Sequence, residues 1–281
     1  MHQTRFERSV PSQNIIEHAL RGSVQESFWV EDAPLGHTLL SLTGQIHCDL
    51  AIVGAGYTGL WTAFLAKARH PEWRVVVLEA ENPGWAASGR NGGFVESTLT
   101  HGESNGKRRY RAEYDQLDKA GLDNLDAIEK TVTEGKWDCD FWRVGSLAVA
   151  VEDHQVPWLR DEADGERAVF LDADAVRKRV NSPTYLAANF SSQDTAMVHP
   201  GKLTRELLTA CLEAGVEVLS HTPVKGLNAD RSLVTLQVPA GEVVAQRVSL
   251  ATNVFPSLLK RYRLHTIPVY DYVLMTEPLT P

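Results

Sequence analysis

The sequence has few cysteines, and they are not spaced as in disulfide frameworks, metal sites or redox motifs. Its three cysteines, Cys48, Cys139 and Cys211, lie far apart and form no CxxC pair. We therefore expect no disulfide framework and no metal site, and three isolated thiols fit a reducing compartment such as the cytoplasm. HExxH, GxSxG and a Walker-type lysine are also missing. The corresponding metalloprotease, serine-hydrolase and P-loop chemistries are therefore not indicated.

The sequence also lacks an apolar run long enough to span a membrane. Its longest uncharged stretch, 50–66, covers 17 residues, fewer than the ~20 that a helix needs to cross a bilayer. The N-terminal charges Arg5, Glu7 and Arg8 are not followed by a long apolar segment, so no secretory signal is predicted. We expect a cytoplasmic protein without a membrane partner.

Positive charge is not in excess. The 28 basic and 36 acidic side chains give a net charge of −8, which disfavours a polyanion-binding role, so no nucleic-acid partner is predicted. The basic run at 107–111 is interpreted as a solvated helix face in preference to a phosphate site, because charge runs usually are solvated. With 281 residues and 43% hydrophobic content, the chain is large enough for one large or two moderate globular domains.

What the sequence does contain is a strand–turn–helix pattern with three glycines. The apolar residues 50–53 lead into Gly54, Gly56 and Gly59, and an alanine-rich helical stretch continues to Arg69. In such a GxGxxG turn the first glycine makes the turn and the second leaves room for a pyrophosphate. The third lets the helix lie close to the strand, so that the positive end of the helix faces the phosphates.

A second apolar strand supports a dinucleotide site. Residues 75–78 read VVVL and are followed by Glu79, twenty positions after Gly59. A carboxylate at about this distance binds the ribose hydroxyls in dinucleotide-binding folds. The glycine pattern alone is also consistent with an ordinary turn, but strand, helix, second strand and acid together favour the dinucleotide.

A second glycine-rich loop follows at 82–93, where the sequence reads NPGWAASGRNGG. Small residues allow backbone N–H groups to point at an anion or an electron-rich ring, and Arg90 and Asn91 add side-chain donors. A surface turn is the alternative. A simple nicotinamide domain would continue with alternating helices and strands at this point, so the loop argues against such a domain.

The remaining sequence predicts further elements of two kinds. Helical spacing runs from 103 to 134, whereas period-two patterns at 147–151 and 185–190 predict a mainly antiparallel sheet. The other expected elements are an aspartate-capped helix at 172–180, a helix that opens at 199–201 and is capped by Gly215, a strand at 216–219, a hairpin of 233–238 with 243–248, and a last strand at 270–275.

We therefore expect an α/β fold with two interleaved domains. An irregular N-terminal arm is predicted at 1–43, in which Phe28 and Trp29 pin the arm against the body. A Rossmann-like domain is expected at 44–138 and 199–266, and a substrate domain at 139–198 and 267–281.

These residues resemble a known family. The segments DLAIVGAGYTGL, VVVLEA, GWAASGRNGG, HPGKL, TPV and LATN occur in this order. They are similar to those of the D-amino-acid-oxidase-like superfamily of FAD-dependent oxidoreductases, and within it of amine oxidases of the γ-glutamylputrescine oxidase type. The likeness covers about residues 28–281. It implies FAD as cofactor and a glutathione-reductase-type FAD-binding domain. Because such proteins continue beyond this point, the substrate domain is expected to be incomplete.

The resemblance also implies which residues contact the cofactor. The pyrophosphate would lie at the first glycine turn, the adenosine ribose at Glu79, and the flavin along the second glycine loop. The backbone of Val224 would face the adenine, although without the resemblance this side chain is better explained as part of the core. The candidate cofactor-binding residues are Gly54, Gly56, Tyr57, Thr58, Gly59, Glu79, Ala80, Ser88, Gly89, Arg90, Asn91, Gly92, Gly93, Val224, Ala251, Thr252 and Asn253.

The resulting hypothesis is a flavoenzyme that oxidises a C–N bond of a small amine or amino acid, with hydride passing to flavin N5 and the imine then hydrolysed. No catalytic residue is assigned, and Arg90 is the candidate for a positive charge beside the flavin. Two alternatives stay open. One is a nicotinamide-dependent dehydrogenase, and the other is an inactive fragment or binding subunit that lacks the C-terminal half.

Overall fold

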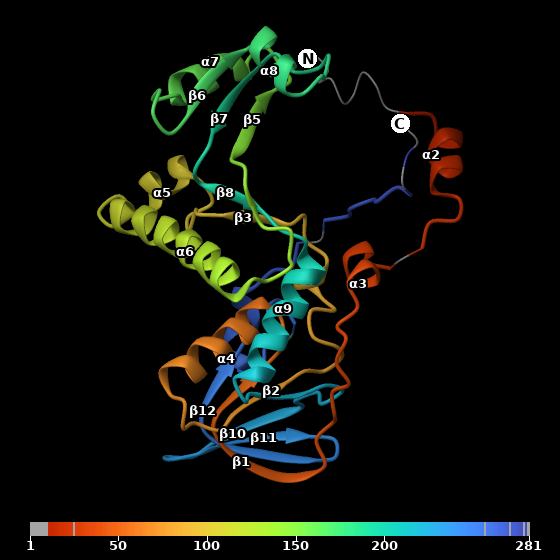
Figure 1. The fold of residues 1–281 in the computed structure, drawn as a ribbon, viewed down its shortest axis with the longest axis vertical. Helices are drawn as coiled ribbons and strands as arrows, with labels where there is room; N and C mark the ends of the chain where they lie inside the picture. Colours follow the sequence, from red (N-terminus) through yellow and green to blue (C-terminus); the bar gives the residue numbers. More distant parts are fainter. Residues whose placement is uncertain (1–10, 25, 256, 270, 278, 280–281) are drawn as a thin grey trace. The chain divides into compact units, whose positions relative to one another are not determined.

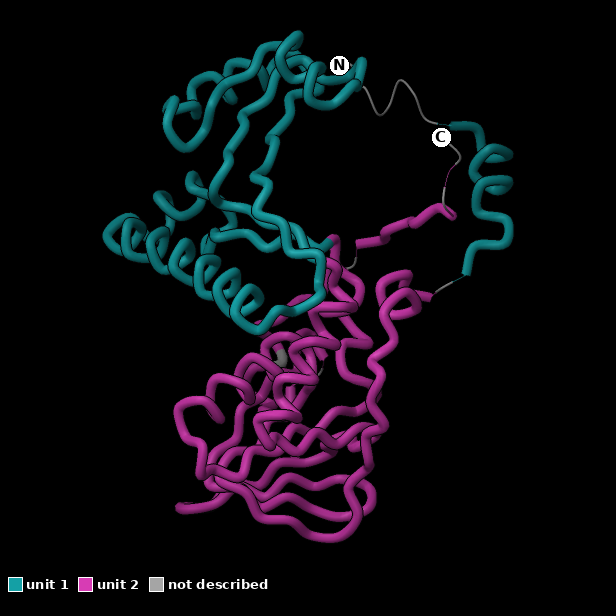
Figure 2. The backbone as a smooth tube through the Cα atoms, viewed as in Figure 1, with its two compact units in different colours: residues 1–25, 93–198 teal, residues 26–92, 199–281 magenta. Residues whose placement is uncertain are grey.

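A computed structural model of the chain describes residues 11–24, 26–255, 257–269, 271–277 and 279. The chain folds into two compact units (Figure 1 and Figure 2). Unit 1 comprises residues 1–25 and 93–198, and unit 2 comprises residues 26–92 and 199–281. The chain leaves unit 2 after Gly92 and returns to it at His199, so the two units are interleaved in sequence, as expected.

Unit 2 is built on a six-stranded sheet of order β10-β11-β12-β1-β2-β9. Its strands are β1 (Gly44–Val53), β2 (Val75–Leu78), β9 (Glu217–Leu219), β10 (Gly226–Ala229), β11 (Val234–Val238) and β12 (Gly241–Leu250). The neighbours β12, β1, β2 and β9 are parallel, and β10 and β11 extend the sheet in antiparallel fashion. Val53 lies beside both Leu250 and Leu78. The parallel strands therefore end at the same edge.

Two helices pack side by side over this sheet, α4 (Tyr57–Arg69) and α9 (Pro200–Glu213) (Figure 1). Their buried faces carry Leu60 on α4 and Leu207 on α9, both fully inaccessible. All four residues of β2 are buried, which is the pattern of a strand covered on both faces. Unit 2 also contains α3 (Phe28–Asp32) and the short 3₁₀ turns η1 (Ala87–Gly89) and η2 (Lys260–His265).

Unit 1 contains two antiparallel three-stranded sheets, which confirms the predicted sheet type. One has the order β3 (Phe94–Glu96), β8 (Thr195–Met197), β4 (Trp142–Arg143), and the other β5 (Ser146–Ala150), β7 (Ala187–Ser191), β6 (Val169–Asp172). Its helices are α2 (Gln13–Leu20), α5 (Glu103–Arg109), α6 (Tyr114–Gly135), α7 (Gln155–Glu162) and α8 (Ala173–Arg179).

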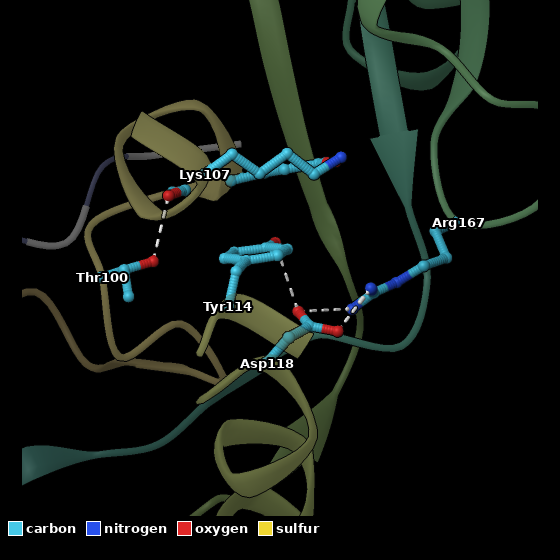
Figure 3. Close-up of polar contacts among 7 residues, drawn as sticks. Thr100, Lys107, Tyr114, Asp118 and Arg167 are labelled. Atoms are coloured by element: carbon cyan, nitrogen blue, oxygen red, sulfur yellow. Dashed lines mark hydrogen bonds and ion pairs between the residues drawn. The ribbon is translucent and has the colours of Figure 1, made fainter. Parts of the chain in front are cut away.

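An ion pair ties α6 to the loop before β6. Asp118 of α6 accepts two hydrogen bonds from the Arg167 guanidinium, at 2.7 and 3.2 Å, and Figure 3 shows the Tyr114 hydroxyl directed at the same carboxylate. Partial burial and the neighbouring Asp118 raise the pKa of Tyr114. The basic run at 107–111 is exposed, in agreement with the solvated face expected for it.

The structure differs from the predicted elements at three places. The helix expected at 103–134 is two helices, because the ring of Tyr114 folds against Gly106 and no helix runs through 110–113. The irregular arm contains α2 and α3. Of the strand expected at 270–275, Tyr270 lies outside the described residues, and 271–275 form no strand. An alternating sequence pattern does not supply the neighbouring strand that a ladder needs.

The unit boundaries also differ from the predicted domains. Residues 93–138, expected in the nucleotide-binding domain, lie in unit 1. The physical reason is strand pairing, since β3 pairs with β8, and the backbone of α6 at Gly121 lies directly on the carbonyl of Ser97. A helical pattern in the sequence does not reveal which sheet the helix covers.

The three cysteines are buried and form no disulfide, and the chemistry of their thiols gives a first prediction. Burial raises the pKa of Cys48 to about 11 and that of Cys211 to about 12. Because the thiolate is the reactive form, an aromatic disulfide reagent at pH 8 should react with the folded protein at least ~100-fold more slowly than with the protein in urea.

The same pKa shifts determine how the stability of the folded protein depends on pH. The stabilisation from these protonated thiols is complete below their ordinary pKa of 9.0 and is lost as the pH rises toward the folded values. Thiol counting over time in buffer and in urea checks the reactivity, and a rapid native reaction would contradict the burial.

Candidate functional site

The candidate residues of unit 2 converge at the carboxyl edge of its parallel strands. Gly54 follows β1, Glu79 follows β2, Val224 lies beyond β9, and Ala251 follows β12. Ligands bind at this edge in open α/β sheets. The structure thus collects segments that are far apart in sequence, whereas Gly93 is the first residue of its segment in unit 1.

The first glycine turn is sterically restricted at two positions. Gly54 has φ +106°, and a Cβ there would lie 2.6 Å from the carbonyl oxygen of Ala251. A Cβ at Gly59 would lie 1.9 Å from the carbonyl oxygen of Gly54, so α4 touches the backbone of the turn. Both positions therefore need glycine for the β1–α4 connection to close.

The N-terminus of α4 presents donors suited to an anion. Among the described residues, the backbone N–H groups of Gly56, Thr58 and Gly59 have no hydrogen-bond partner. The first amides of a helix lack intrahelical acceptors and lie at its positive end, where phosphates bind. The donor set present here therefore fits a pyrophosphate.

Ser88 links the second glycine loop to this turn. Its Oγ accepts a hydrogen bond of 2.9 Å from the N–H of Tyr57. A Cβ on Gly56 would approach the same oxygen to 2.8 Å. The two glycine motifs recognised in the sequence are thus parts of one site.

Glu79 has a larger structural role than expected. The residue is 6% exposed, and its carboxylate accepts hydrogen bonds from the N–H groups of Ala55 at 2.7 Å and Glu81 at 3.0 Å, and from the indole of Trp85 at 2.9 Å. A carboxylate has about four acceptor positions, so one remains for a ribose hydroxyl. Glu79 braces the turn and the second loop, and it can still bind a ligand.

Two polar residues of the second loop behave differently from each other. The Asn91 side chain donates to the carbonyls of Ala87 and Ser88, at 3.1 and 2.9 Å, so it folds the loop, where the sequence predicted a donor to the ligand. Arg90 is exposed, and its Nε donates to the Trp85 carbonyl at 2.8 Å. Within the described part of the chain its Nη groups have no protein partner, so they are available to a ligand.

The remaining candidates lie at the ends of β9 and β12. The Val224 side chain is half-buried and packs on the hydrophobic core, as the alternative interpretation held. Its backbone N–H and carbonyl nevertheless have no hydrogen-bond partner among the residues described. Thr252 begins a tight turn with Phe255, Asn253 has φ +48°, and Ala80 is exposed.

Sequence reasoning missed Trp85, although it lies inside the second glycine loop. Its indole reaches Glu79, and its ring lies 5.5 Å from that of Phe255, centroid to centroid. A signal was present, because a tryptophan in a glycine-rich loop needs a partner for its N–H. Within the described ranges, no group of three or more His, Cys, Asp or Glu side chains is arranged to bind a metal, and no helix is long and apolar enough to cross a membrane.

Several curated proteins are similar in sequence to most of this chain. It is 27% identical to the probable oxidoreductase OrdL of Haemophilus influenzae, over 85% of the chain and 58% of that protein. It is 30% identical to the γ-glutamylputrescine oxidoreductase of Escherichia coli, over 85% and 57%. L-2-hydroxyglutarate dehydrogenase of Escherichia coli is 24% identical over 69% and 44%. The chain thus spans less than two thirds of these relatives.

Solved structures share the fold. The glycine oxidase of Geobacillus kaustophilus superposes with a TM-score of 0.64 at 20% identity, covering 74% of this chain and 56% of that one. The L-amino acid deaminase of Proteus vulgaris has a TM-score of 0.60 at 17% identity, covering 78% and 51%. A family model described as FAD dependent oxidoreductase (DAO) matches residues 49–281. The chain belongs to the DAO family of FAD-dependent oxidoreductases.

Proposed function

We propose that this chain binds FAD at the carboxyl edge of the unit 2 sheet, and that the whole protein oxidises a C–N bond of a small amine or amino acid. The observation that carries the binding proposal is the group of unpartnered amides at the start of α4, joined to the second glycine loop through Ser88. A nicotinamide site would not need that second loop.

Three parts of the cofactor have a candidate partner on this chain. The amides of Gly56, Thr58 and Gly59 would hold the pyrophosphate. The remaining acceptor position of Glu79 would take a ribose hydroxyl, and the backbone of Val224 would take the adenine edge. FAD, when bound, supplies the acceptor for the hydride equivalent that leaves the carbon beside the amine nitrogen, and the imine is then hydrolysed.

Arg90 is the charged group of this chain best placed to assist that chemistry. Its Nε is held by the Trp85 carbonyl, so the guanidinium is oriented while its Nη donors remain available. A fixed positive charge stabilises negative charge that develops nearby during a reaction. We assign it this electrostatic role and no proton transfer, because an arginine does not lose its proton in proteins.

The substrate class is inferred from the names of similar proteins. Two of them, the γ-glutamylputrescine oxidoreductase and the glycine oxidase, are named for amine-containing substrates. The L-2-hydroxyglutarate dehydrogenase is named for a hydroxy acid, so oxidation of a C–O bond is the competing reaction class.

Binding and turnover are tested separately. Titration of the protein with FAD and with NADH should give a saturable visible spectrum with FAD and no saturable signal with NADH. The FAD complex is then mixed without oxygen with glycine, L-amino acids, γ-glutamylated and free diamines, and L-2-hydroxyglutarate. Bleaching by an amine or amino acid supports the proposal. Saturable NADH binding without FAD binding overturns the cofactor, and bleaching by the hydroxy acid alone overturns the substrate class.

A further inference from the structure

We propose that Ser27, Trp29, Asp32 and His199 form a clamp that holds the second glycine loop in the shape that binds the flavin half of FAD. We call these four residues the α3 clamp. The inference rests on the proposed function, because it concerns the same cofactor. It adds residues that lie outside both glycine motifs and are assigned here a positioning role.

The α3 clamp contacts the loop through two hydrogen bonds to backbone carbonyls. The Ser27 hydroxyl donates to the carbonyl of Gly89, and the Trp29 indole N–H donates to the carbonyl of Asn91 at 2.9 Å. Ser27 is the N-cap residue of α3, where a serine usually accepts a bond from its own helix. Its side chain makes no such cap and is directed to the loop instead.

These bonds orient the loop. A trans peptide unit is planar, so its carbonyl and the following N–H point in opposite directions, and the structure contains no cis peptide bond among the residues it describes. Fixing the Asn91 carbonyl on Trp29 therefore aims the Gly92 N–H away from α3. That N–H has no partner within the described chain, which leaves it available to a ligand.

The clamp is anchored on α9 through His199. This residue is 7% exposed, and its Nδ1 caps α9 by accepting a hydrogen bond from the Lys202 N–H at 3.1 Å. The acceptor role of Nδ1 places the proton of the neutral ring on Nε2, which donates to Asp32 at 3.1 Å. The ring of Trp29 lies edge-on to the His199 ring, with centroids 4.8 Å apart.

Backbone packing adds to this anchor. A Cβ on Gly201 would lie 2.0 Å from the Trp29 carbonyl oxygen, so α3 rests directly on the first turn of α9. The loop is thus held on α3 at Gly89 and Asn91 and on the α4 turn at Ser88. A glycine-rich loop that is already ordered loses less conformational entropy on binding, and preorganisation of this kind raises affinity.

The test compares FAD with ADP, which lacks the flavin half. In Ser27→Ala and Trp29→Phe, the dissociation constant for FAD should rise about 10-fold, or 1.4 kcal/mol. The constant for ADP should change less than twofold, because the α4 amides and Glu79 are untouched. Ser27→Thr keeps the hydroxyl and should restore the FAD affinity. Glu31→Gln, an exposed change on the same helix, is the matched control.

The measurements are flavin fluorescence for FAD, calorimetry for ADP, and the fine structure of the bound flavin band near 450 nm, each well below the melting temperature. If Trp29→Phe does not fold, the Ser27 pair decides. Equal losses of FAD and ADP affinity, or unchanged FAD affinity, overturn the clamp while the proposed cofactor stands. A wild-type protein that binds ADP but not FAD overturns the proposed function and the clamp together.

Discussion

Replacement of Gly59 by alanine is expected to reduce FAD affinity at least ~100-fold, or ~2.8 kcal/mol, and to lower the free energy of unfolding. The added Cβ would lie 1.9 Å from the carbonyl oxygen of Gly54, and this atom belongs to the backbone of the turn, which cannot rotate away. The start of α4 must therefore move off β1. Overpacking of this kind costs about 1–3 kcal/mol, which exceeds the ~1 kcal/mol that alanine gains over glycine in a helix.

Displacement of α4 also explains the loss of binding. The N–H groups of Thr58 and Gly59 belong to the displaced turn, and an anion site loses strength quickly as its donors leave hydrogen-bonding distance. Flavin fluorescence measures the affinity, and denaturant unfolding measures the stability. The matched control is Ala68→Gly, an exposed position of the same helix, which should cost ~1 kcal/mol in stability and leave FAD affinity unchanged. A Gly59→Ala protein that binds FAD within twofold of wild type would show that the close contact is not required.

The elements that were predicted correctly are determined by residues close to one another in the sequence. The strand expected at 75–78 is β2 with identical bounds. A short apolar run with a charged residue on each side defines both ends of the strand. Asp172 caps α8 through the N–H of Ala175 at 2.9 Å, as its place before the helix indicated. The glycine turn and Glu79 lie together because neighbouring parallel strands bring their carboxyl ends to one edge, and their assignment to the cofactor stays a prediction.

The elements that were not predicted depend on contacts that are distant in sequence. Helices α2 and α3 have only eight and five residues and no buried side chain, so neither offers the long apolar pattern from which a helix is predicted. The positions that Ser27 and Trp29 contact lie 62 residues further along the chain. The sequence around α3 contains no pattern that would predict these contacts. The structural role of Glu79 was not predicted for a related reason, since its donor Ala55 lies 24 residues away in the chain and its donor Trp85 reaches it only when the second loop is folded.

Glu79→Gln is expected to destabilise the protein by about 2–3 kcal/mol even without cofactor, and to reduce FAD affinity about 10-fold. The amide nitrogen of glutamine donates and cannot accept, so the substitution leaves at least one of the three donors that face Glu79 without its bond. A buried donor without an acceptor costs about 1–3 kcal/mol, and a hydrogen bond to a charged group is worth about 1.5–3 kcal/mol.

This variant separates the two roles of Glu79. If the carboxylate braces the turn and the second loop, unfolding of the cofactor-free protein in denaturant will show the loss. If its only task is to bind ribose, Glu79→Gln will change FAD affinity and leave the cofactor-free stability as in wild type. Glu81→Gln is the matched control, since Glu81 is exposed and contributes its backbone N–H, which the change preserves. The buried geometry of Glu79 favours the first outcome, because a ribose ligand alone would not need three protein donors.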